Sequence, residues 1–172
     1  MKSLVPFTST QRTAQFTVSA DFFQTNATQL IIEFKISGPL EHIAWPAPGI
    51  IESREDGLWK GTCLEAFFSE GSQKHDPYVE INCSPNGNWN AYAFSSYREG
   101  MTPSQNIVVR LKERSSDSKE AYFRIEVLGT SPLNVKVMGL TAVIEFSNGE
   151  KSYWALRHPA PQADFHDKGG WD

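Results

Sequence analysis

Short segments in which apolar and polar residues alternate recur along the whole chain, and they constrain its fold more than any other feature. Alternation with a period of two is typical of β-strands that bury one face. Turn-forming sequences such as Pro85-Asn86-Gly87-Asn88 and Asn148-Gly149 separate the segments. No segment carries the capped apolar stripe of an amphipathic helix. We expect strands at residues 16–19, 30–36, 64–68, 79–83, 89–94, 107–111, 122–128, 138–146 and 153–156.

Many short strands at such spacing predict an all-β protein. We expect a two-sheet antiparallel β-sandwich of immunoglobulin-like or jelly-roll-like architecture. The chain has 172 residues, which suits a single domain over 1–172. Hydrophobic residues make up 40% of the sequence, enough to fill a core between two sheets.

Composition argues against several classes of partner. The net charge is −4 and the basic residues are scattered, whereas nucleic-acid binding needs a clustered positive surface. The longest apolar runs have the length of strands, so we expect no membrane span. The first ten residues lack the apolar stretch of a signal peptide, and we therefore expect a cytoplasmic protein.

A hairpin is predicted between residues 78–83 and 89–94. Pairing Cys83 with Trp89 fixes its register, since each step along the strands adds one facing pair. The pairs that follow are Asn82 with Asn90, Glu80 with Tyr92, and Tyr78 with Phe94. One face is apolar and should belong to the core: Val79, Ile81, Cys83, Trp89, Ala91 and Ala93. The other face is polar and aromatic, and Glu65 and Phe67 continue it on the preceding strand.

The two cysteines are expected to stay reduced. The same alternation places Cys63 on the polar face and Cys83 on the core face of one sheet. A disulfide needs Cβ atoms about 4 Å apart that face each other. Thiols on opposite sides of a sheet do not meet this requirement.

The polar and aromatic face predicts a binding site. Carboxylates, carboxamides and aromatic rings together suit a sugar, since rings stack on its C–H face while the polar groups bind its hydroxyls. We also expect Arg124, on a later strand, to pair with one of the glutamates. Alternatives remain open: the polar groups could form an internal hydrogen-bond network, or the domain could bind proteins and no small ligand. No metal-binding spacing is found, and a catalytic role for Glu65 and Glu80 is not expected.

Three runs of sequence, 58–68, 78–89 and 97–101, resemble the DOMON-like group of bacterial proteins. That group is similar to family 9 carbohydrate-binding modules. The closing stretches 153–159 and 164–166 also resemble it, so the resemblance covers roughly residues 5 to 168.

The resemblance implies an immunoglobulin-like sandwich that binds sugar or haem. Trp59 and Glu65 keep the six-residue spacing of the sugar-binding modules, and Trp154 matches the second tryptophan of their aromatic clamp, with Trp171 as a second choice. Asn82 matches a ligand-binding asparagine, whereas Glu80 stands where those modules have an arginine.

The leading hypothesis is a non-catalytic domain that binds carbohydrate, or a similar small polar ligand, on a concave sheet face without a cofactor. Its predicted ligand-binding residues are Trp59, Glu65, Glu80, Asn82, Asn90, Tyr92 and Trp154, supported by Tyr78, Arg98 and Arg124.

The alternative that the resemblance implies is binding of haem b for electron transfer. Met101 would be one axial ligand, and His158 or His75 would be the other.

Overall fold

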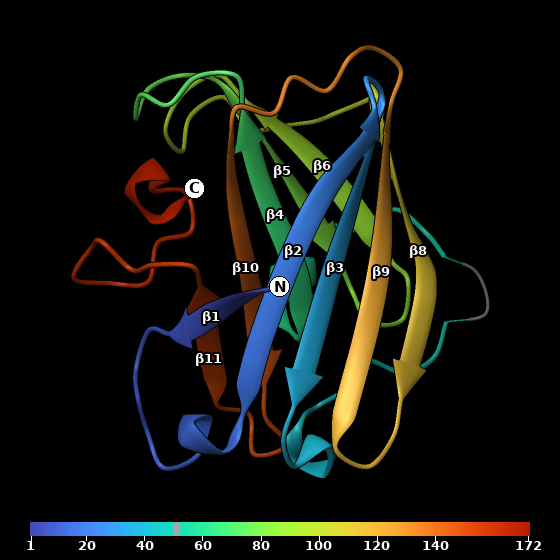
Figure 1. Ribbon diagram of the computed structural model, residues 1–172, viewed down its shortest axis with the longest axis vertical. Helices are drawn as coiled ribbons and strands as arrows, with labels where there is room; N and C mark the ends of the chain where they lie inside the picture. The colour runs from blue at the N-terminus through green and yellow to red at the C-terminus, as the bar shows by residue number, and fades with distance from the viewer. Residues whose placement is uncertain (50–51) are drawn as a thin grey trace.

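The computed structural model describes residues 1–49 and 52–172, which form one antiparallel sheet of 11 strands (Figure 1). Within the described residues, single-turn 3-10 helices lie between strands at Thr13–Gln15, Leu40–His42 and Leu58–Lys60, and a fourth, Lys168–Gly170, follows the last strand. The strands are β1 (Lys2–Pro6), β2 (Thr17–Asn26), β3 (Gln29–Ser37), β4 (Cys63–Ser69), β5 (Tyr78–Cys83), β6 (Trp89–Phe94), β7 (Thr102–Pro103), β8 (Ile107–Ser116), β9 (Glu120–Gly129), β10 (Val137–Glu145) and β11 (Lys151–Ala155).

The sheet curls so strongly that its two halves face each other. Its strand order is β7-β6-β5-β4-β10-β11-β1-β2-β3-β9-β8, and in Figure 1 strands β2, β3, β9 and β8 lie in front of β10, β4, β5 and β6. Strand β1 joins the halves because Leu4 pairs with Val18 of β2 while Val5 pairs with Ala155 of β11. The predicted all-β antiparallel class is confirmed, but the expected two separate sheets are wrong, since β1 makes the sheet continuous.

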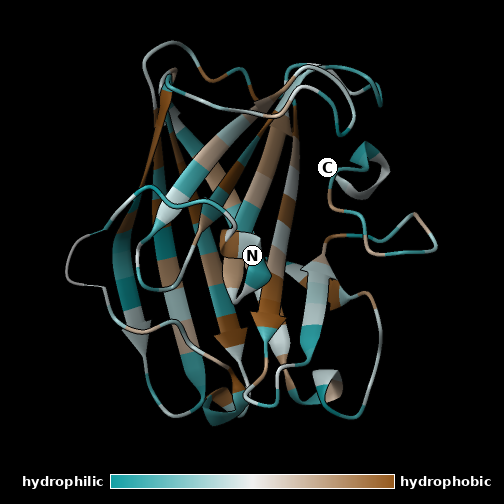
Figure 2. Cartoon of the chain, turned by 180° about the vertical axis from the view of Figure 1, so that it is seen from behind, coloured by the Kyte–Doolittle hydropathy of each residue, from teal (hydrophilic) through white to brown (hydrophobic). Residues whose placement is uncertain are grey.

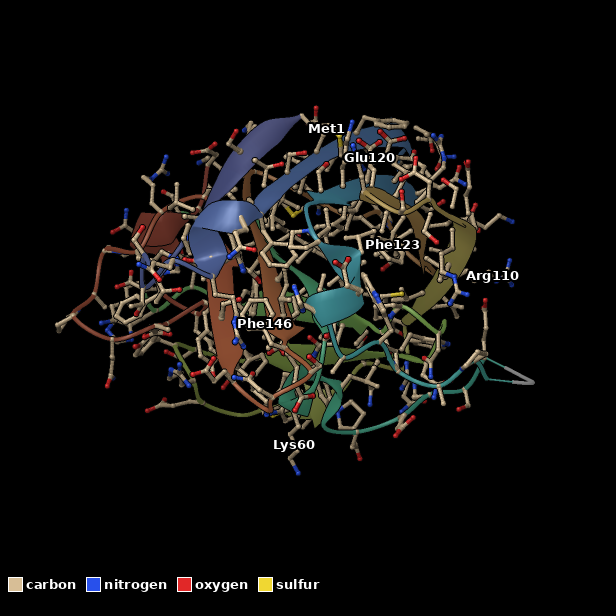
Figure 3. All side chains as sticks on the ribbon, turned by 90° about the horizontal axis from the view of Figure 1, so that it is seen from below. Met1, Lys60, Arg110, Glu120, Phe123 and Phe146 are labelled. Carbon is tan, nitrogen blue, oxygen red and sulfur yellow. The ribbon has the colours of Figure 1, made fainter. Side chains whose placement is uncertain are left out.

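The main hydrophobic core fills the space between the two halves. The halves contribute apolar side chains from alternate strand positions, among them Phe34 and Phe123 on one side and Leu64 and Ile81 on the other. Hydrophobic and hydrophilic residues accordingly alternate along the strands in Figure 2. Viewed from below in Figure 3, Phe123 and Phe146 lie toward the middle of the molecule.

The predicted hairpin register is confirmed in β5 and β6. Cys83 faces Trp89, and the three further predicted pairs follow in order. The opposite faces of the two cysteines are confirmed as well. Cys83 lies in the main core, whereas Cys63 lies on the other face, with Sγ 3.8 Å from Oδ1 of Asn82, and both thiols are free.

The C-terminal segment, residues 156–172, folds back over the outer face of this half of the sheet. Backbone hydrogen bonds join Met138 of β10 to Asp172 in both directions, at 2.7 and 3.0 Å. Gly139 makes room for the indole of Trp171, because a Cβ at this position would lie 2.6 Å from Cδ1 of that ring. The segment completes a second, smaller aromatic cluster of Phe67, Tyr78, Tyr92, Phe94 and Trp171.

Lys168 fastens the same segment to the loop between β4 and β5. Its buried ammonium group donates hydrogen bonds to Oγ of Ser69 at 2.9 Å, to the carbonyl oxygen of Gly71 at 3.1 Å and to that of Asp76 at 2.9 Å. Three acceptors satisfy all of its N–H groups, so burial leaves none unpaired. Within residues 1–49 and 52–172, no helix has both the length and the apolar character needed to cross a membrane.

Candidate functional site

A pocket of about 400 Å³ lies on the outer face of β4 and β5, the face turned away from the main core. Glu65, Phe67 and Glu80 contribute to it from the two strands. The 3-10 helix before β4 adds Trp59, and the C-terminal segment adds Phe165. Strand residues therefore form part of the recess, and a loop and the C-terminal segment complete its walls on the outer face of the sheet, where we had expected a concave sheet face.

Glu65 is a buried carboxyl group with one unpartnered oxygen. Its side chain lies on β4 beside Thr141 of β10, whose hydroxyl group donates to Oε2 at 3.4 Å. Oε1 has no hydrogen-bond partner among the described residues. Burial, reinforced by the nearby charge of Glu80, raises the pKa of Glu65 well above its ordinary value. A buried polar atom without a partner is costly, so Oε1 is a natural point of contact for a ligand in the pocket.

Glu80 is the second carboxyl group of the pocket. Its Oε1 accepts a hydrogen bond from Nδ2 of Asn82 at 2.7 Å. Burial raises the pKa of Glu80 to about 7, although the Asn82 hydrogen bond and the charge of Arg98 act in the opposite direction. Oε2 lies 3.9 Å from Nε2 of His166, too far for a direct hydrogen bond. This oxygen is therefore also available to a ligand.

His166 enters the pocket from the C-terminal segment and is oriented by a short hydrogen-bond chain. The backbone N–H of Arg98 donates to the hydroxyl oxygen of Tyr78 at 3.2 Å, and that hydroxyl lies 2.6 Å from Nδ1 of His166. Burial lowers the pKa of His166 to about 4, so the imidazole is neutral at pH 7. We assign the proton to Nε2, because Tyr78 accepts from Arg98 and has its own O–H free to donate to Nδ1.

Arg98 is held in an unusual backbone conformation at the rim of the pocket. Its φ of 57° lies in the left-handed region, which is uncommon for a residue other than glycine. Its Nη2 donates to Oδ1 of Asp164 at 2.8 Å, and the hydroxyl of Tyr97 donates to the other oxygen of this carboxylate. Burial alone would raise the pKa of Asp164, but these hydrogen bonds lower it. The positive charge of Arg98 is thus balanced by an ionised partner.

Three of the predicted ligand-binding residues, Trp59, Glu65 and Glu80, line the pocket. The ring of Trp59 is 36% exposed and meets the ring of Tyr92 edge-on, with centroids 5.8 Å apart. Asn82 is completely buried beneath Glu80, so it acts on a ligand only through that carboxyl group.

Trp154, which we expected to stack on the ligand, is instead a core residue. Its side chain is only 2% exposed and packs between the two halves of the sheet, and Nε1 donates to Oγ of Ser152 at 2.8 Å. Successive residues of a strand point to opposite faces, and it is Tyr153 that reaches the pocket. Trp171, the second choice, packs against Phe67 in the smaller aromatic cluster.

Asn90 and Tyr92 lie on the predicted face, but their side chains form hydrogen bonds within the protein. Asp56 Oδ1 accepts from Nδ2 of Asn90 at 2.8 Å and from the hydroxyl of Tyr92 at 2.8 Å. These bonds hold the segment that leads into the helix carrying Trp59. Both residues therefore position one wall of the pocket and do not line it, contrary to their predicted role.

Of the three predicted supporting residues, two lie near the pocket and one lies far from it. Tyr78 and Arg98 belong to the hydrogen-bond chain that orients His166. Arg124 was expected to pair with one of the site glutamates, but it lies on β9 in the other half of the sheet, where Nη1 is 2.6 Å from Oε1 of Glu33. That expectation is wrong, because the curl turns the two polar faces away from each other.

Only one of the residues proposed as haem ligands lines the pocket. Met101 lines the pocket and is 44% exposed. His158 lies outside it, with Nε2 3.0 Å from the carbonyl oxygen of Val5. His75 also lies outside it, with Nδ1 3.2 Å from Oγ of Ser96. Among the residues that the structure describes, no three His, Cys, Asp or Glu side chains gather as a metal site would require.

The pocket also contains residues that we did not predict as ligand contacts: Tyr153, Phe165 and His166. Tyr153 could have been found from strand alternation, since it must face away from its core neighbour Trp154. Phe165 and His166 had no periodic signal, because they belong to an irregular segment whose path depends on tertiary packing.

Fold and pocket together define an all-β module with a ligand-sized recess on the outer face of a curled sheet. No protein-family model matches the chain, and no curated protein sequence matches it. Solved structures do share its fold, as the following comparisons show.

A protein from Bacteroides uniformis, provisionally described as carbohydrate-binding, superposes with a TM-score of 0.64 at 12% identity, over 99% of this chain and 83% of the other. A family 9 carbohydrate-binding module from Caldicellulosiruptor kristjanssonii, in complex with cellotriose, superposes with a TM-score of 0.54 at 9% identity, over 99% of this chain and 78% of the other. A family 9 module from the same organism, in complex with glucose, superposes with a TM-score of 0.51 at 10% identity, over 97% of this chain and 78% of the other. The resemblance to family 9 modules expected from the sequence is thus confirmed for the fold.

Proposed function

We propose that residues 1–172 form one non-catalytic domain that binds carbohydrate in the pocket above β4 and β5. The observation that carries this proposal is the unpartnered Oε1 of Glu65 in a recess walled by aromatic rings. A sugar hydroxyl would supply the missing hydrogen bond, and Glu80 offers a second such contact.

The walls suit the apolar side of a sugar ring. Trp59 is 36% exposed and Tyr153 is 37% exposed, so both rings have surface available for stacking. The volume of about 400 Å³ falls within the range of small-molecule sites. The cellotriose and glucose bound by the family 9 modules of the same fold support a glycan ligand here.

Below pH 7, the protonated state of the two carboxyl groups favours binding without catalysis. A glycosidase needs one ionised carboxylate to act as nucleophile or general base, beside one carboxylic acid. Burial raises the pKa of Glu65 well above its ordinary value and that of Glu80 to about 7, which favours the protonated form of each below pH 7. Neutral carboxyl groups are suited to exchanging hydrogen bonds with hydroxyl groups.

The test is titration of the purified protein with glucose and cellotriose by calorimetry. We expect the wild type to bind, and we expect Trp59→Ala and Glu65→Gln to weaken binding by at least about tenfold, or about 1.4 kcal/mol. Trp45→Ala is the matched control for the tryptophan, because Trp45 is also 36% exposed but lies at a different part of the surface. Glu126→Gln, on the outer face of β9, is the control for the carboxyl group.

Two results would contradict the proposal. One is the absence of binding across a broader glycan panel. The other is equal affinity in the site variants and their controls, which would place the binding elsewhere. A Soret absorption band in the purified protein would favour the haem alternative over carbohydrate.

A further inference from the structure

The pocket offers a ligand two acidic side chains and, among its described lining residues, no unpaired cation. Glu65 and Glu80 both line it, and each has an oxygen with no hydrogen bond from a protein group. The cation at the rim, Arg98, is already paired with Asp164 at 2.8 Å. His166 is neutral and offers only an N–H group. Among the described lining residues, no cation is left without an acidic partner to receive an anionic ligand.

The walls of the pocket also favour a positive ligand. Phe67, Phe94, Tyr153 and Phe165 surround the carboxyl groups, with Trp59 at the mouth. Aromatic faces carry negative electrostatic potential and attract cations, and tryptophan does so most strongly. Aromatic walls around acidic groups recognise ammonium groups, because an ammonium group both donates hydrogen bonds to the carboxyl groups and is attracted by the rings. A neutral hydroxyl group makes only the hydrogen bonds.

We propose that the pocket prefers sugars that carry a protonated amine over neutral sugars of the same shape, and that it excludes acidic sugars. This inference rests on the proposed carbohydrate-binding function and names the class of sugar. The ammonium group would donate to Oε1 of Glu65 and to Oε2 of Glu80, and such charge-assisted hydrogen bonds are stronger than those of a hydroxyl. A sugar carboxylate that entered the pocket would face two acidic groups without an available cation.

The experiment compares four ligands that share the glucopyranose ring on the wild-type protein: glucose, glucosamine with its amine at C2, N-acetylglucosamine with that nitrogen acetylated, and glucuronate with a carboxylate at C6. Titrations are run at a pH that keeps the amine of glucosamine protonated. We expect glucosamine to bind at least about tenfold more tightly than glucose. N-acetylglucosamine, which keeps the nitrogen but loses the charge, should bind no better than glucose, and glucuronate should not bind measurably.

Variants assign the preference to the two carboxyl groups. Glu65→Gln and Glu80→Gln should each bring the affinity ratio of glucosamine to glucose toward one, while Glu126→Gln should leave that ratio unchanged. Thermal unfolding of each variant checks that the fold is retained. The comparison of ligands on the wild type needs no variant, so it tests the amine preference even if a variant fails to fold.

The outcomes separate this inference from the proposed function. Glucose binding as tightly as glucosamine would overturn the amine preference, and measurable binding of glucuronate would overturn the exclusion of acidic sugars. Either result would leave carbohydrate binding standing. Failure of all four sugars, together with failure of a broader glycan panel, would overturn both.

Discussion

The hydroxyl group of Tyr78 lies 2.6 Å from Nδ1 of His166, and this contact joins β5 to the C-terminal segment. The two residues are 88 positions apart in the sequence. The contact determines which imidazole nitrogen carries the proton, and hence which group His166 presents to the pocket.

Tyr78→Phe should remove the hydroxyl group that fixes the protonation of His166. The aromatic ring stays stacked on Phe94, with ring centroids 4.6 Å apart in the wild type. We expect loss of the fixed Nε2–H tautomer and ligand binding weakened several-fold. Nitrogen NMR of the imidazole and calorimetric titration measure the two effects. Tyr122→Phe is the matched control, since it removes a hydroxyl that bonds Glu33 at 2.8 Å on the other half of the sheet. An unchanged tautomer in Tyr78→Phe would contradict the assigned hydrogen-bond chain.

Trp59 and Trp154 should respond to replacement in opposite ways. Trp59→Ala removes a ring that is 36% exposed, so the free energy of unfolding should fall by no more than about 1 kcal/mol while ligand affinity drops. Trp154→Ala empties a site in the main core and should cost about 3–5 kcal/mol. Chemical denaturation and ligand titration of both variants provide the measurement. A loss of about 3 kcal/mol or more in Trp59→Ala would instead identify that residue as part of the core.

Glu80 should make the protein less stable as the pH rises. Its pKa is about 7 in the folded state against 4.5 ordinarily, so the folded state holds the proton more tightly. The resulting stabilisation is fully present below pH 4.5 and is lost as the pH rises to about 7. His166 acts in the opposite sense, because its pKa is lowered from 6.5 to about 4 and its contribution is lost as the pH falls through that interval.

Comparison of Glu80→Gln with the wild type isolates the glutamate from this opposing effect. The glutamine can still accept from Asn82, and it does not ionise. We expect the stability of the variant relative to the wild type to increase by up to about 3 kcal/mol as the pH rises from 4.5 to about 7. Urea denaturation at several pH values measures the difference, and equal m-values check that both proteins unfold alike. A difference that does not change with pH would contradict the burial of this carboxyl group.

Gly139→Ala should loosen the C-terminal segment. Its methyl group would lie 2.6 Å from Cδ1 of Trp171, so the indole must move and the segment that carries one wall of the pocket must move with it. We expect a loss of roughly 1–3 kcal/mol in stability, faster proteolysis of the last residues, and weaker ligand binding. Gly61→Ala is the control, since its methyl group would meet the flexible Glu145 side chain at 3.4 Å. Equal proteolysis of the two variants would show that Trp171 does not hold the segment in place.

The sequence by itself predicted the strands other than β1 and β7, and it predicted the faces of the central hairpin. Alternation decides which side chains share a face, and a single assumed pair, Cys83 with Trp89, was enough to predict every other pair of β5 and β6 correctly. The same reasoning separated the two cysteines and brought Glu65 and Glu80 to one side of the sheet. These features are local, because they depend on backbone geometry over a few residues.

Only the tertiary structure decided how the sheet closes and what covers its outer face. The double pairing of β1 makes one curled sheet, and this curl removes Arg124 from the site glutamates. Phe165 and His166 reach the pocket from an irregular segment, guided by Gly139 and Lys168 rather than by any periodic pattern. Contacts between residues that are distant in the sequence depend on packing energies summed over the whole molecule, and no local pattern contains that information.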